Sequence, residues 1–184
     1  VLSEFGVLSA VCDTNSQRAK EFGKKYSVNS YDSFESLLEH EEFDAALVCT
    51  PTFTHSDITK RLIENKKHVF VEKPMTYLSE DGQNLIDAAK RNNVILTCGY
   101  IERFNPAVAS VKDFLKSQKY GDLIRLEFYR EHRMPQHIKD VGVIYDTSVH
   151  DIDTAMWLFD ETPEIVFAIA GKINHEHEDF ATIT

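Results

Sequence analysis

Short, unbroken apolar runs alternate with helix-like segments along the first half of the chain. Apolar stretches of this length are typical of strands buried on both faces. The runs lie at 7–12, 45–49, 68–71 and 94–98. Between them, apolar side chains recur at helical spacing, at 16–26, 34–38, 58–63 and 79–89. Strands that alternate with helices in this way predict an α/β fold with a parallel, doubly wound sheet.

The pattern changes after about residue 105. Asn105 followed by Pro106 predicts a helix start, because Asn caps helices well and Pro suits the first turn. Residues 123–133 alternate between apolar and polar side chains, which predicts a half-buried strand. A helix is expected at 149–159, and a further strand at 164–172.

These patterns divide the chain into a dinucleotide-binding domain at 1–104 and an α+β domain at 105–184 with a mainly antiparallel, open sheet. A doubly wound dinucleotide-binding domain normally opens with a strand and a glycine-rich turn. Residues 1–6 are too short for both, and the chain stops within an apparent strand. We therefore expect a piece of the natural protein to be missing at each end.

Composition narrows the class of protein. A formal net charge of -10 argues against nucleic-acid binding, which needs an excess of Lys and Arg. No apolar run approaches the roughly 20 residues of a membrane span, so no membrane partner is expected. The cysteines at 12, 49 and 98 lack metal-ligand spacing and are predicted to be buried free thiols. Free thiols indicate a reducing, cytoplasmic location.

The tripeptide Glu72-Lys73-Pro74 directly follows the apolar run at 68–71. In an open α/β sheet, ligands bind at the carboxyl ends of the strands. Lys73 is therefore a candidate to donate to a substrate oxygen or to relay a proton, and Pro74 stiffens the turn that carries it. The alternative is a salt bridge between Lys73 and Glu72 or another acid of a loop.

Asp13 ends the first apolar run. A carboxylate in this place accepts hydrogen bonds from the ribose hydroxyls of a dinucleotide and repels a 2'-phosphate, which favours NAD over NADP. The alternative is an ordinary Asp that begins a turn before a helix.

The segment Thr50-Pro51-Thr52, followed by His55, comes after the second run. Small hydroxyl residues and a rigid proline allow a cofactor to approach the backbone closely. The alternative is a helix entry in which Thr54 caps the helix that contains His55.

Asp146 and His150 are four residues apart at the expected start of a helix. If Asp146 lies in the last extended residues before that helix, the local turn brings the two side chains to one face. A carboxylate beside an imidazole orients the ring and raises its basicity, as a general base requires. The alternative is that His150 caps or stabilises the helix.

No metal site is predicted. His150, Asp151 and Asp153 contain metal-ligating side chains, but neighbouring helix positions face different ways, which disfavours a shared ion. The histidines at 175 and 177 are interpreted as part of a solvated hairpin, with a metal site as the minor alternative.

In their order and spacing, these motifs resemble the Gfo/Idh/MocA family of nicotinamide-dependent oxidoreductases. The motifs are Asp13, Thr50-Pro51-Thr52 with His55, the run 68–74, and Asp146 with His150. The resemblance implies a Rossmann domain followed by an α+β domain whose open sheet forms a homo-oligomer, a dimer or a tetramer. It also implies hydride transfer between a secondary hydroxyl of a sugar and NAD. Segments 99–108 and 138–143 look like the branch that oxidises nucleotide sugars, in particular archaeal UDP-N-acetylglucosamine 3-dehydrogenase.

Residue roles follow from the same resemblance. His150 is implied to be the acid/base, with Lys73 polarising or relaying a proton from the substrate hydroxyl and Asp146 completing the catalytic group. The implied cofactor-binding residues are Asp13, Thr50, Pro51, Thr52, His55, Glu72, Lys73, Pro74 and Arg103. The implied substrate-binding residues are Lys73, Arg103, Asn105, Arg133, Lys139 and His150.

Two other functions remain open at the level of sequence. One is a non-catalytic NAD-binding sensor or paralogue on the same fold. The other is a family member that uses NAD transiently in hydrolysis or elimination.

Overall fold

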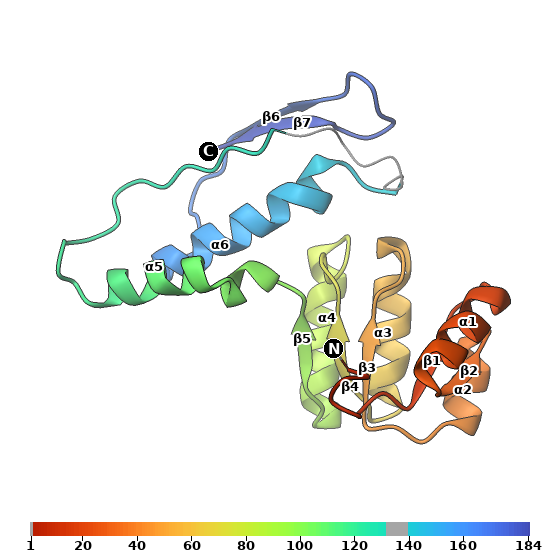
Figure 1. Cartoon of the computed structure of the whole chain (residues 1–184). Coiled ribbons are helices and arrows are strands. Elements are labelled where there is room, and N and C mark those ends of the chain that lie inside the picture. Colours follow the sequence, from red (N-terminus) through yellow and green to blue (C-terminus); the bar gives the residue numbers. More distant parts are fainter. Residues whose placement is uncertain (1, 132–139) are drawn as a thin grey trace. The chain divides into compact units, whose positions relative to one another are not determined.

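The computed structural model describes residues 2–131 and 140–184, which are drawn in Figure 1. The chain divides into two compact units, 1–45 and 46–184. Among the described residues, no helix has the length and apolar character needed to cross a membrane.

The unit 1–45 is built on two short parallel strands, β1 (Ala10–Cys12) and β2 (Asn29–Tyr31), with helices α1 (Ser16–Tyr26) and α2 (Phe34–His40). Gly23 lets α1 approach β2, because a Cβ at this position would lie 2.7 Å from the Cβ of Ser30. The side chain of Ser33 accepts the N–H of Ser36, which confirms the predicted cap of α2.

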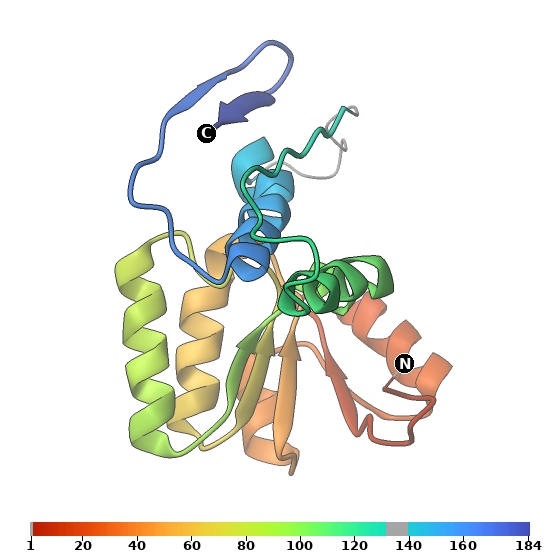
Figure 2. The same cartoon turned by 90° about the vertical axis from the view of Figure 1, so that its left-hand side faces the viewer.

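The unit 46–184 begins with a parallel sheet in the order β3 (Ala45–Val48), β4 (His68–Val71) and β5 (Leu96–Cys98). Helices α3 (His55–Glu64) and α4 (Ser79–Asn92) lie side by side along this sheet (Figures 1 and 2). The core between them is made of fully or nearly fully buried apolar side chains: Val48, Leu62, Ile63, Val69, Val71, Leu85, Ala88 and Ala89. The predicted alternation of strands and helices is thus confirmed, whereas burial on both faces is not, since β3 and β5 keep partly or fully exposed positions.

The later part of this unit contains two further helices, α5 (Pro106–Lys116) and α6 (Val149–Phe159), which pack against each other. They are followed by the antiparallel pair β6 (Ala168–Gly171) and β7 (Phe180–Ile183). Asn105 caps α5 through its side chain, which accepts the N–H of Ala107. The predicted helices starting at 106 and 149 are confirmed, and β6 is shorter than the strand expected at 164–172.

Lys112 joins the two helices. Its side chain is only 8% exposed, and its ammonium group donates to the carbonyl oxygens of Trp157 and Leu158 in the last turn of α6. Carbonyls at the end of a helix have no partner within the helix, and a cation there also suits the helix dipole. Lys112 therefore completes the C-terminal end of α6.

One predicted strand is wrong in its described part. Residues 123–131 form no strand, although they alternate in polarity as a half-buried strand does. A period of two residues produces a strand only where a neighbouring strand offers backbone partners. Among the described residues, the antiparallel sheet contains β6 and β7 alone, so the pattern at 123–131 has no ladder to join.

The alternative role of Thr54 as a cap and the burial of the cysteines also differ. Thr54 donates its hydroxyl to the carbonyl oxygen of Pro51 and makes no cap bond to α3. All three cysteines are free, as predicted. However, Cys12 at the end of β1 and Cys49 directly after β3 are exposed, and only Cys98 is partly buried.

Lys112→Met should lower the free energy of unfolding by about 2 kcal/mol, because two carbonyls lose a charged donor while the apolar stem stays buried. Trp157 is the only tryptophan of the chain, so its fluorescence during urea unfolding reports on the affected helix directly.

Lys116→Met is the matched control, since Lys116 is exposed on the same helix and its loss should change stability by less than ~0.5 kcal/mol. Equal stability of the two variants would show that Lys112 does not hold the end of α6.

Candidate active site

The turns that follow the three parallel strands meet at one edge of the sheet. Past the strand ends, the N–H of Glu72 donates to the carbonyl oxygen of Val48, and the N–H of Gly99 donates to that of Val71. A Cβ at Gly99 would lie 2.8 Å from Oε2 of Glu72, so a larger residue here would displace the end of the Glu72 side chain. The Glu72 carboxylate is therefore packed directly against the turn after β5.

Lys73 reaches from the turn after β4 to the segment that precedes α6. Its Nζ lies 2.9 Å from Oδ1 of Asp146 and 2.5 Å from the carbonyl oxygen of the same residue. The two side chains are 21% and 16% exposed. The expected ion pair of Lys73 with an acid is thus present, but the partner is Asp146 rather than Glu72. The Lys73-Pro74 peptide bond is cis.

Asp146 lies in a π-helical turn, η3 (Ile144–Ser148), which runs directly into α6. The condition of an extended Asp146, under which its side chain would face His150, is therefore not met. The N–H of Val149 reaches the carbonyl of Ile144, five residues earlier, and π-helical turns of this kind are frequent at functional sites. The local widening brings both the carboxylate and the carbonyl of Asp146 to the Lys73 ammonium.

His150 lies in the first turn of α6, and its Nδ1 is buried with no hydrogen-bond partner in the described structure. Burial lowers the pKa of His150 from its ordinary value, and the positive charges of Lys73 and Arg130 lower it further. This is opposite to the expectation that Asp146 raises the basicity of the ring, because the Asp146 carboxylate is bound to Lys73 instead. The ring is consequently uncharged at neutral pH and able to accept a proton.

A group of ion pairs around His150 was not predicted from the sequence. Arg103 binds Asp153 through two hydrogen bonds, with Nε 2.8 Å from Oδ2 and Nη2 2.6 Å from Oδ1. Arg130 donates its Nε to Asp151 at 2.8 Å from Oδ2, and its Nη2 lies 3.6 Å from Glu102. The only indication of these ion pairs in the sequence was that Asp151 and Asp153 lie close to His150 along the chain.

Arg103 and Glu102 belong to a 3-10 turn, η2 (Ile101–Phe104), directly after β5. The pairs Arg103–Asp153 and Arg130–Asp151 therefore tie η2 and the segment that contains Arg130 to the first half of α6. Asn105, expected at the substrate, uses its side chain as the cap of α5 and donates to Glu102. The turn after β5 is thus held by a hydrogen bond from the cap residue of α5 and by an ion pair with α6.

The turn after β3 is held in a different way. The hydroxyl of Thr54 donates to the carbonyl oxygen of Pro51 and accepts from the hydroxyl of Thr50, 2.6 Å away, and the N–H of Thr52 donates to Oδ2 of Asp140 at 3.1 Å. His55 is buried, and both of its ring nitrogens lie 2.8 Å from backbone carbonyl oxygens. Its side chain therefore faces the protein interior rather than a ligand.

Asp13 belongs to the compact unit 1–45. Its Oδ1 accepts the N–H of Asn15 at 2.8 Å, and its Oδ2 pairs with Arg18 at 3.2 Å. This is the turn geometry that was considered as the alternative to a ribose-binding role. Arg133 and Lys139, expected at the substrate, lie outside the described residues.

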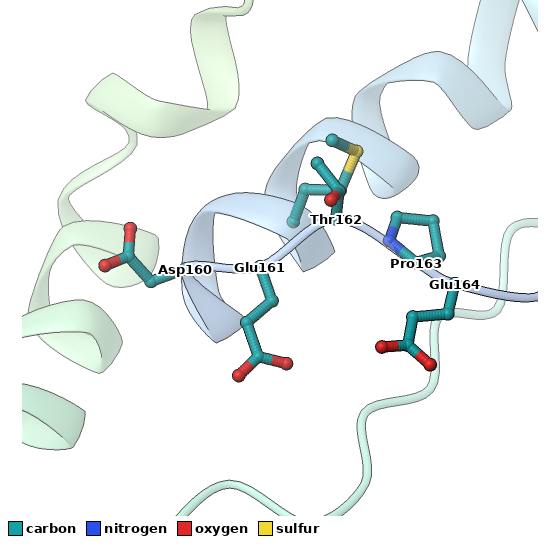
Figure 3. Close-up of a pocket in the computed structure, with 6 residues that line it drawn as sticks. Asp160, Glu161, Thr162, Pro163 and Glu164 are labelled. Carbon is teal, nitrogen blue, oxygen red and sulfur yellow. The ribbon is translucent and has the colours of Figure 1, made fainter.

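An open hollow lies at the opposite end of α6 from His150. It is lined by Met156, Asp160, Glu161, Thr162, Pro163 and Glu164, and Figure 3 shows its side chains. The three carboxylates in that view point apart. Over the parts of the chain that the structure describes, no group of His, Cys, Asp or Glu is arranged to hold a metal ion. The expected absence of a metal site has not been contradicted, and the strand-end turns remain the better candidate site.

Comparison with known proteins gives matches over nearly the whole chain. Residues 3–100 match the model described as "Oxidoreductase family, NAD-binding Rossmann fold", and residues 108–184 match the GFO/IDH/MocA C-terminal domain. Scyllo-inositol 2-dehydrogenase (NAD(+)) of Bacillus subtilis is 36% identical over 147 residues, which are 77% of this chain and 42% of that protein.

UDP-N-acetylglucosamine 3-dehydrogenase of Acidithiobacillus ferrooxidans is 30% identical over 175 residues, covering 95% of this chain and 54% of that protein. A solved structure of the enzyme of that name from the same organism aligns with a TM-score of 0.84 at 30% identity, over 96% of this chain and 56% of the other. This relative is bacterial, whereas the resemblance pointed to archaeal enzymes. The chain spans about half the length of the curated relatives it matches.

Lys73→Met should raise the pKa of His150 toward its ordinary value, because the variant removes one of the positive charges that disfavour protonation of the ring. An NMR titration of the His150 ring measures this shift without any substrate.

Lys66→Met serves as the control, since Lys66 follows the C-terminal end of α3, away from the turn that leads into its start, and its ammonium binds Asn92. An unchanged pKa of His150 in Lys73→Met would mean that the Lys73 charge does not act on the ring.

Proposed function

The chain belongs to the Gfo/Idh/MocA family of oxidoreductases, and we propose that it acts as an NAD-dependent dehydrogenase on a secondary hydroxyl of a sugar. The observation that carries the proposal is an ammonium group bound to Asp146 close to an uncharged His150. A dehydrogenase must remove a hydroxyl proton while a hydride leaves the same carbon. A neutral imidazole and a positioned cation are the two groups that this chemistry needs.

The proposed role of Lys73 follows from the number of N–H donors that its ammonium group has left. An ammonium group has three N–H donors, and Asp146 uses two of those on Lys73, which leaves one for a substrate oxygen. That donor stabilises the oxygen as its proton leaves, and His150 accepts the proton. Asp146 holds the ammonium in place. Bound NAD supplies the acceptor for the hydride.

The cofactor proposal is supported by the shape of the strand-end turns. The carboxyl ends of neighbouring parallel strands are where open α/β sheets bind a dinucleotide, and β3, β4 and β5 end together. The proposal retains Thr50, Pro51, Thr52, Glu72 and Pro74 as turn residues beside NAD.

NAD is proposed over NADP because of Asp13, which follows β1. A ribose 2'-phosphate would meet the Asp13 carboxylate, and the neighbouring Arg18 is already paired with that carboxylate. The similarity to a dehydrogenase named with NAD(+) supports the same choice.

The proposed substrate is a nucleotide sugar such as UDP-N-acetylglucosamine. Similarity to the Acidithiobacillus ferrooxidans enzyme supports this choice, whereas similarity to an inositol dehydrogenase supports a free polyol as the second candidate. Arg103 retains three of its five N–H groups for a substrate after binding Asp153. Asn105, Arg133 and Lys139 stay in the proposal as further substrate ligands.

We also propose a cytoplasmic homo-oligomer, with the domain boundary at 104/105. The free thiols at all three cysteines support the location. The exposed apolar side chains of Ile169 and Phe180 on the β6–β7 sheet support pairing of copies through that sheet.

A panel of UDP-sugars and free inositols, followed by absorbance of reduced cofactor, tests the function. Net NADH with a UDP-sugar supports the proposal, and net NADH with an inositol alone moves the substrate to the polyol class. Product without net NADH would indicate transient use of NAD. NAD binding with no product from any compound would identify a sensor.

Lys73→Ala should lower kcat by about 100-fold or more, because the variant removes the donor to the substrate oxygen, while the affinity for NAD is largely kept. Stopped assays with saturating sugar and a separate NADH-binding titration measure the two effects. Lys66→Met should behave as the parent. Full turnover in Lys73→Ala would exclude Lys73 from the reaction.

A further inference from the structure

His55 occupies an unusual place for a histidine. It is the first residue of α3, its side chain is 1% exposed, and both ring nitrogens face backbone carbonyls. Nδ1 lies 2.8 Å from the carbonyl oxygen of Pro74, and Nε2 lies 2.8 Å from that of Thr50. One ring therefore touches the turn after β4 and the turn after β3.

Both contacts call for donation by the ring, because a carbonyl oxygen can only accept. A neutral imidazole carries one N–H, so it donates to one of the two turns in either tautomer. The doubly protonated ring donates to both. A buried carbonyl oxygen needs a hydrogen-bond partner. The carbonyls of Pro74 and Thr50 lie beyond the ends of β4 and β3, and the His55 ring faces both of them.

The two turns carry the groups of the candidate site. Pro74 directly follows Lys73, whose ammonium reaches Asp146. Thr50 begins the turn in which the N–H of Thr52 binds Asp140. A shift of the ring would move both turns, although the ring itself is too deeply buried to touch a ligand.

We propose that His55 is a positioning residue that sets the spacing between the two turns and thereby the placement of Lys73. The link to turnover rests on the proposed dehydrogenase function, while the link between the turns does not. This role differs from the direct cofactor contact expected of His55 from sequence. The ring acts through Pro74 on Lys73 and through Thr50 on the turn after β3.

Two conservative variants separate the two links. The amide nitrogen of Asn matches the place of Nδ1, and the amide nitrogen of Gln matches that of Nε2. His55→Asn therefore keeps the contact with Pro74 and loses the contact with Thr50, and His55→Gln does the reverse. His55→Leu loses both. Hydrogen–deuterium exchange of the amides at 50–54 and 72–76 reads out each turn in the whole protein.

We expect exchange to rise at least ~10-fold at 50–54 in His55→Asn, at 72–76 in His55→Gln, and at both segments in His55→Leu. Turnover should follow the turn that carries Lys73, so His55→Asn should keep more of kcat than His55→Gln. A purely structural role would lower stability in both variants without this division.

Leu62→Ala is the matched control, because Leu62 lies on the same helix and is equally buried but contacts neither carbonyl. It should lower stability without selective exchange in the two turns. Uniform exchange in the two amide variants, or none, would overturn the proposal. The exchange measurement needs no substrate. Absence of dehydrogenase activity in the parent protein would therefore overturn the proposed reaction alone, and the exchange pattern would still decide whether His55 positions the two turns.

Discussion

The bond between Lys73 and Asp146 is the interaction on which the candidate site depends. It joins the end of β4 to the π-helical turn before α6, two segments that are more than seventy residues apart in the chain. A partly buried ammonium is costly without a partner, and a partly buried carboxylate is costly for the same reason. Each group therefore fixes the other, and with it the two backbone segments that carry them.

The state of His150 follows from this pairing. Because Asp146 is engaged by Lys73, it does not act as the partner of the imidazole, and the nearby ammonium makes protonation of His150 harder. Burial acts in the same direction. The arrangement separates the two tasks of the proposed reaction, since the group that donates to the substrate oxygen and the uncharged group that accepts the proton are different side chains.

Helix α6 is held at both ends by charged side chains from other elements. Near its start, Asp151 and Asp153 bind Arg130 and Arg103, and at its end Lys112 binds the last carbonyls. Three cationic partners spread along one helix leave it little freedom to rotate or slide. His150, in the first turn, is consequently presented at a defined place relative to the turn after β5 and to Lys73.

The sequence by itself determined the alternation of strands and helices, the bounds of most elements, and the place of Lys73 at a strand end, because burial patterns and capping residues act over a few residues. It also contained the motifs of the family. It misjudged residues 123–131, because an alternating pattern does not reveal whether a partner strand is present. Only the tertiary structure decided that Asp146 pairs with Lys73 and that His55 bridges two turns. Those contacts join segments far apart in the chain, and local patterns contain no information about which distant groups will meet.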